Sequence, residues 1–160
     1  MLIVGGTEML AMVMLVPYDG SPLAKAALRR AAEFAEYTGK PVLALSVIPD
    51  EPGFAIDRGW IDADEPFDVE VIADRLATEV HEIAPEANVR HEIPEDVSSM
   101  ASVTMDVVRT IRSVAAEVDA AIVFIGSENA GRVSTPVSSV GAPVSEDPQY
   151  DVHIVRHVHH

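Results

Sequence analysis

The sequence predicts an α/β fold with a doubly wound, five-stranded parallel sheet in the order 3-2-1-4-5 and helices on both faces. Short apolar runs alternate along the chain with longer segments whose apolar residues recur at helical spacing. Two of the runs, Pro41 to Ile48 and Ala120 to Ile125, are almost continuously apolar, as strands are when both faces of a parallel sheet are covered. Such alternation requires right-handed crossovers and an open parallel sheet.

The first half of the chain predicts a strand, a helix and a second strand. Ala11 to Val16 is the first strand, and it ends in Pro17-Tyr18-Asp19-Gly20-Ser21-Pro22. Ser21 can cap a helix and Pro22 suits its first position, so a helix is expected from there to Gly39, a typical stop. Pro41 to Ile48 is the second strand.

A long acidic loop is expected from Pro49 to Phe67. Loops of this length inside a compact domain usually have a function. We hypothesise that Trp60, the single tryptophan of the chain, and the loop around it cover a binding crevice. The alternative is a surface loop held in place by its one aromatic residue.

The second half continues the alternation of helices and strands, and the chain contains no internal sequence repeat. The predicted elements are a helix from Asp68 to Pro85, an edge strand from Asn88 to Ile93, a helix marked by Val107 to Val118, the strand Ala120 to Ile125, a weak helix from Pro136 to Val144, and a last strand from Val152 to Val155.

Composition narrows the classes of partner and compartment. With 160 residues, 48% hydrophobic residues and a mean hydropathy of +0.18, the chain fits about one domain with a sizeable core. Its 26 acidic and 11 basic residues give a formal charge of −15, which disfavours nucleic acid and anionic membrane as partners. We interpret the excess of acid as adaptation to high salt, because salt screens the mutual repulsion; an ordinary acidic protein is the alternative.

The two ends and the absence of cysteine limit the chemistry further. The first 16 residues contain no Lys or Arg, so neither a signal peptide nor a spanning helix is expected, and the predicted location is the cytoplasm. Without cysteine there are no disulfides and no thiolate nucleophile. We expect an N-terminal extension over residues 1–9, the domain over 10–156 and a His-rich tail over 157–160.

A ligand crevice is expected where the strand order reverses, at the ends of the first and fourth strands. The loops there are Tyr18 to Pro22 and Gly126 to Ser139. The carboxylate of Asp19 can accept hydrogen bonds from an adenine amino group or a ribose hydroxyl, or it can hold the turn before Ser21; the two interpretations have equal weight. The second loop offers backbone amides, several hydroxyls and one cation, Arg132, for binding an anion. The alternative, which composition alone favours, is a flexible loop rich in Ser, Thr and Gly.

Two segments resemble the universal stress protein family. They are VPYDGS at 16–21, followed by an Ala-rich helix, and EVDAAIVFIGS at 117–127, and the likeness extends over residues 10–156. The resemblance implies the fold described above and homodimers formed largely through the last strand, here Val152 to Val155. In ATP-binding members an Asp matched by Asp19 meets adenine, and a backbone contact comes from the position of Val47.

The same family uses a loop of the form G-x2-G-x9-G-[S/T] for ribose and phosphates. Gly126 matches its first glycine, and the second position falls on Asn129. The third falls on Ser138 or, in another alignment, on Gly141. The residues that the resemblance and the loops place at the site are Asp19, Val47, Gly126, Ser127, Asn129, Arg132, Ser138 and Ser139.

The resulting prediction is a regulatory homodimer with weak or degenerate binding of ATP and Mg²⁺. The alternative is a protein without nucleotide that acts through contact with a partner protein. A phosphoacceptor receiver domain is disfavoured because no Lys follows Lys40. His81 and His91 lie far from the crevice and are expected to be solvated or structural, while His153 is expected at the dimer interface, so no general base can be named.

Overall fold

The computed structural model describes residues 13–94, 103–126 and 150–156. Its elements, in chain order, are β1 (Val13–Pro17), α2 (Pro22–Thr38), β2 (Val42–Val47), α3 (Pro52–Asp57), α4 (Val69–Ile83), β3 (Asn88–Glu92), α5 (Val103–Glu117), β4 (Ala120–Gly126) and β5 (Asp151–Val155).

The strands form one parallel sheet in the order β3-β2-β1-β4-β5. Both the strand order and the all-parallel pairing confirm the prediction. The chain moves outward from β1 to β3, then returns to the other side of β1 through α5 and β4. The strand order therefore reverses between β1 and β4, so their carboxyl ends flank the crevice.

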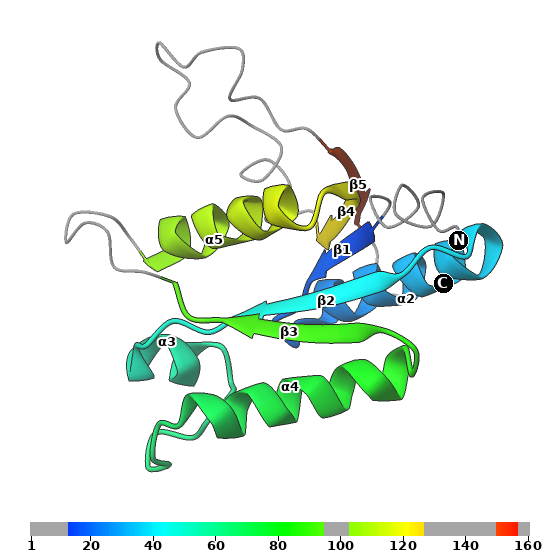
Figure 1. Ribbon diagram of the computed structural model, residues 1–160. Coiled ribbons are helices and arrows are strands. Elements are labelled where there is room, and N and C mark those ends of the chain that lie inside the picture. Colours follow the sequence, from blue (N-terminus) through cyan, green and yellow to red (C-terminus); the bar gives the residue numbers. More distant parts are fainter. Residues whose placement is uncertain (1–12, 95–102, 127–149, 157–160) are drawn as a thin grey trace, which may run out of the picture.

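Helices cover both faces of the sheet, as predicted. Figure 1 shows α2 and α4 against one face and α5 against the other. The side chains of β1 alternate between the two cores: Met14 and Val16 pack on the side of α2 and α4, and Leu15 packs on the side of α5. Because β1 lies in the middle of the sheet, all three are essentially inaccessible to solvent.

The turn after β1 and the start of α2 follow from local chemistry. Ser21 caps the helix, since its Oγ accepts a hydrogen bond from Ala24 N at 3.1 Å, and Pro22 occupies the first turn. At the other end Gly39 has φ of +73°, and its N–H donates to Ala35 O at 2.8 Å. These bounds agree with the prediction.

The expectation of one continuous loop from Pro49 to Phe67 was wrong, because this segment contains the short helix α3. Pro52 stands in the first turn, where its missing N–H costs nothing, and Ala55 is fully buried. Helix α5 also begins at Val103, about one turn before the first apolar residue that marked it. The weak helix predicted from Pro136 to Val144 lies outside the described residues.

Within the described ranges, no helix combines the length and the apolar character that crossing a membrane requires.

Candidate functional site

The exit of β1 is a tight turn held by Asp19. Its Oδ1 accepts a hydrogen bond from the backbone N–H of Ser21 at 2.9 Å, and Gly20 adopts φ of +83°. This is the turn-holding role that the sequence allowed for Asp19. It uses one carboxylate oxygen and fixes the direction in which the other points.

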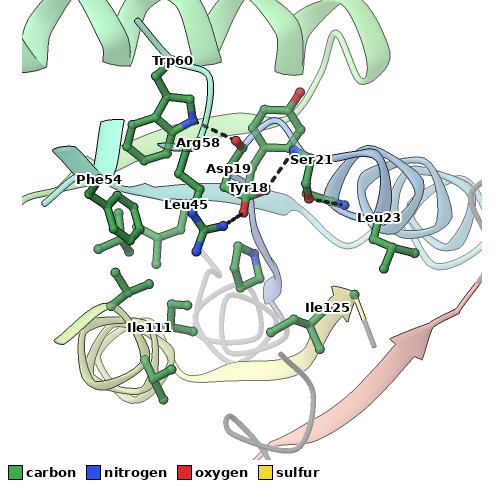
Figure 2. A pocket seen from close by; sticks show the side chains of 16 residues that line it. Tyr18, Asp19, Ser21, Leu23, Leu45, Phe54, Arg58, Trp60, Ile111 and Ile125 are labelled. Carbon is green, nitrogen blue, oxygen red and sulfur yellow. Dashed lines mark hydrogen bonds and ion pairs between the residues drawn. The ribbon is translucent and has the colours of Figure 1, made fainter. Parts of the chain in front are cut away.

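The second oxygen of Asp19 faces the segment that follows β2. Arg58 Nη1 donates to Oδ2 at 2.6 Å, and Trp60 Nε1 donates to the backbone carbonyl of Asp19 at 2.9 Å. Figure 2 shows both side chains reaching from this segment to the β1 turn. The α3 segment is therefore attached to the end of β1 by two hydrogen bonds, one of them charge-assisted.

Backbone groups at the end of β2 point toward the same place. The carbonyls of Pro41 and Leu45 accept from β1 and Tyr18, whereas the N–H of Ile48 donates to β3. Odd-numbered residues of β2 thus direct their backbone groups to the β1 side. The N–H and C=O of Val47 are accordingly turned toward the crevice, beyond the last residue of β1.

Close packing between the end of β4 and the start of α2 requires a glycine at position 126. A Cβ built on it would lie 2.8 Å from Leu23 Cβ on α2, closer than two carbons can approach. The absence of a side chain at Gly126 lets the end of β4 lie directly against the start of α2. The glycine that sequence analysis assigned to ligand binding has a structural requirement of its own.

These residues surround one cavity of about 60 Å³. Asp19, Val47 and Gly126 all line it, and Arg58 is the single cation among its described lining residues. Apolar side chains from β2, α3 and α5 form most of the remaining wall. They include Leu45, Phe54, Trp60, Val107, Val108 and Ile111.

A buried tyrosine, Tyr18, directly precedes Asp19 and is held by two hydrogen bonds. Tyr18 OH donates to Glu79 Oε1 at 2.7 Å, and Ser46 Oγ donates to the carbonyl of Tyr18 at 2.9 Å. Burial, followed by the hydrogen bond to Glu79, raises the pKa of Tyr18 far above its ordinary value. Tyr18 consequently stays protonated and acts as a donor at all physiological pH values.

The α3 segment brings in two side chains that sequence analysis missed. Arg58 lies over the ring of Phe54, with its Cζ 4.7 Å from the ring centroid, and Phe54 packs against Trp60 at a centroid distance of 5.7 Å. Arg58 is the sole basic residue between 49 and 67. Its position in an acidic segment is a feature of the sequence that could have indicated a charged partner. Trp60 is 8% exposed and lines the cavity; its role as a cover over a ligand stays a prediction.

Comparison of the sequence with family models identifies the family over nearly the whole chain. The model of the universal stress protein family matches residues 12–156. The chain belongs to the universal stress protein family. Among curated proteins no match was found.

Solved structures share the fold of this universal stress protein. A universal stress protein in complex with cAMP is 20% identical, with 92% of this chain and 98% of that chain covered and a TM-score of 0.54. The Archaeoglobus fulgidus protein in complex with dAMP is 22% identical, with 91% and 96% covered and a TM-score of 0.50. A family member from Burkholderia pseudomallei is 17% identical, with 93% and 98% covered and a TM-score of 0.50.

Three residues of the predicted site, Asp19, Val47 and Gly126, lie in the described part of the chain, and all three line the same cavity. The other five lie outside the described residues: Ser127, Asn129, Arg132, Ser138 and Ser139. Where the chain is described, no group of His, Asp and Glu side chains could hold a metal ion.

The three histidines in the described part of the chain lie away from the cavity. His81 Nε2 is 3.2 Å from Ala87 O, and His91 Nε2 is 3.4 Å from a carboxylate oxygen of Glu70. His153 on β5 packs against Phe34 and Phe124 of its own chain; its predicted place in a dimer interface stays a prediction.

Proposed function

We propose that this universal stress protein is a regulatory module that binds an adenine nucleotide in the crevice between the ends of β1 and β4. The observation that carries the proposal is the convergence of Asp19, Val47 and Gly126 on one cavity at the reversal of strand order. Asp19 supplies an acceptor for an amino or hydroxyl group, and Val47 supplies backbone groups beside apolar walls that suit a base. Relatives of the same fold have been solved with cAMP and with dAMP.

ATP is the nucleotide that we propose, with Mg²⁺ as its counter-ion. In the described part of the cavity wall Arg58 is the sole cation, and it is already paired with Asp19. A triphosphate therefore needs a cation that it brings itself, together with amides and hydroxyls of the loop from Gly126 to Ser139. We assign no hydrolytic step, since no side chain of the site is placed as a general base.

The test starts with nucleotide released from the purified protein on denaturation, followed by calorimetric titration with Mg-ATP. Asp19→Asn keeps the size of the side chain but removes its charge, and binding should weaken by about 1–3 kcal/mol. The matched control is Asp57→Asn, an exposed carboxylate at the end of α3, which should bind as the parent does. Equal binding by the Asp19 variant would place the ligand elsewhere.

A negative result has a defined meaning. If the protein carries no adenine nucleotide and gives no heat with millimolar Mg-ATP, the nucleotide proposal is wrong. The remaining candidate is then a nucleotide-free module that acts through a protein partner. The small volume of the cavity among the described residues, about 60 Å³, is the observation that favours this second candidate.

We further propose that two copies associate through β5. This strand ends the sheet in the described residues, and Ile154 on it is 38% exposed. An edge strand with an exposed apolar side chain can pair with a second copy. Ile154→Lys should convert dimers to monomers by light scattering, whereas Val71→Lys, which changes an exposed residue on α4, should not.

A further inference from the structure

Arg58 occupies the two features of the cavity that a nucleobase would use. Its guanidinium lies between Phe54 and Asp19 (Figure 2), with Nη1 at 2.6 Å from Asp19 Oδ2 and Cζ at 4.7 Å from the Phe54 centroid. One contact takes the free carboxylate oxygen, and the other covers an aromatic face. Both are lost to a ligand for as long as Arg58 stays there.

The guanidinium and the amino edge of a nucleobase are alike in chemistry. Each is a flat group that stacks on an aromatic ring and donates N–H bonds in its own plane. A carboxylate next to a ring therefore suits either of them. From this overlap, and building on the proposed function, we propose that Arg58 is an internal competitor that the base must displace from Asp19, so that Arg58 sets the affinity of the site.

The ion pair is weak enough for a ligand to displace. The side chains of Arg58 and Asp19 are 33% and 23% exposed, and pairs open to water contribute little to stability. The need to release such a pair lowers the affinity for a ligand by a factor of about two to five. Arg58 thus lowers the affinity of the site without closing it.

Displacement needs a movement of the Arg58 side chain alone. The segment around it stays attached, because Trp60 Nε1 donates to Asp19 O at 2.9 Å and Arg75 Nη1 donates to Trp60 O at 2.9 Å. Ala55 and Ile61 are buried on either side of Arg58. The exposed guanidinium can turn toward solvent while α3 and Trp60 keep their places.

Salt provides a signature of this competition. Screening weakens the pair as the Debye length falls to about 3 Å at 1 M, so the base should bind more tightly at high salt. Adenosine is the probe to use, because it has no phosphate and does not respond to the acidic charge of the whole protein. Its salt dependence then reports on the Arg58–Asp19 pair, once the general effect of salt on apolar binding is subtracted.

The experiment compares adenosine affinity, measured by calorimetry and by Trp60 fluorescence, between the parent, Arg58→Gln and Arg109→Gln. The control removes the same charge and a similar pair, since Arg109 Nη1 lies 2.9 Å from Asp106 Oδ1 on α5. We expect Arg58→Gln to bind adenosine about two to five times more tightly than the parent at low salt. We also expect the gain to shrink at high salt and the control to follow the parent.

Each other outcome overturns a defined statement. Weaker or equal binding by Arg58→Gln, with binding still weakened in Asp19→Asn, rejects the competition and leaves the nucleotide site in place. An equal salt response of the parent and Arg58→Gln also rejects it. If neither protein binds adenosine or Mg-ATP at any salt concentration, the proposed function fails and the competition fails with it.

Discussion

At the scale of single residues, Gly126 both allows close packing of β4 on α2 and lines the cavity. The end of β4 lies so close to α2 that an added methyl group would meet Leu23 Cβ at 2.8 Å. Leu23 also lines the cavity, so a shift of α2 at this point would move the wall of the proposed binding site. The same contact therefore matters for stability and, under the proposed function, for ligand binding.

We predict that Gly126→Ala destabilises the protein by about 1–3 kcal/mol, as overpacking a close contact does. The free energy of unfolding, measured by urea denaturation, checks this. Gly53→Ala is the matched control, because nothing lies within 4 Å of the added carbon there and alanine favours a helix. Equal stability of the Gly126 variant would mean that α2 and β4 separate at little cost.

The residues of the site were predictable only where their signal was local. The turn role of Asp19 follows from Tyr18-Asp19-Gly20-Ser21, since the partner is two residues away. The pair with Arg58 spans 39 positions and depends on where the segment after β2 folds back. A lone basic residue in an acidic segment hinted at a partner but could not identify it.

At the scale of elements, the strands were predicted well and the segment after β2 was not. Continuous apolar runs in β2 and β4 have few other interpretations once helices alternate with them. Helix α3 has six residues and begins Pro-Gly, which is turn chemistry in isolation. Its stability comes from tertiary contacts, above all the buried Ala55 and the indole N–H of Trp60, which donates to Asp19 O at 2.9 Å. The sequence pattern does not contain these contacts.

Strand β5 is attached to the core through a titratable side chain. The ring of His153 packs edge-to-face against Phe34 and at a tilt against Phe124, at centroid distances of 5.3 and 5.0 Å. Its Nε2 lies 3.1 Å from Arg30 Nη1. A guanidinium can only donate, so Nε2 is the acceptor and the imidazole is neutral. Burial, and then the charge of Arg30, lower the pKa of His153 below its ordinary value.

Acid should therefore weaken β5. Because the folded pKa lies below the unfolded value of about 6.5, the unfolded chain binds the proton first as pH falls. The stabilisation is complete above about pH 6.5 and is lost as pH falls through the folded pKa. His153→Phe keeps an aromatic ring there, and its free energy of unfolding should fall less between pH 7 and pH 5 than that of the parent.

The exposed His91 is the comparison for this effect. Its side chain is 37% exposed beside Glu70, and His91→Gln should leave most of the acid sensitivity in place. If His153→Phe and the parent lose stability equally on acidification, the attachment of β5 does not depend on neutral His153.

At the scale of the whole molecule, the charge acts against the proposed ligand. The chain has 26 acidic and 11 basic residues, a formal charge of −15. A field of this size repels a triphosphate over distances of about 10 Å at 0.1 M salt. The fold places a cavity where the strand order reverses, while the charge of the whole chain opposes the entry of an anion.

We predict that the affinity for Mg-ATP rises several-fold from low to high salt, because screening removes this repulsion. Calorimetric titrations at fixed Mg²⁺ and increasing KCl measure it. Adenosine separates the two sources of the effect, since it responds to the Arg58–Asp19 pair and not to the net charge. The rise for ATP should therefore exceed the rise for adenosine, and in Arg58→Gln the excess for ATP should persist. An ATP affinity that falls steadily with salt is typical of a basic phosphate site, and it would mean that local cations outweigh the field of the whole protein.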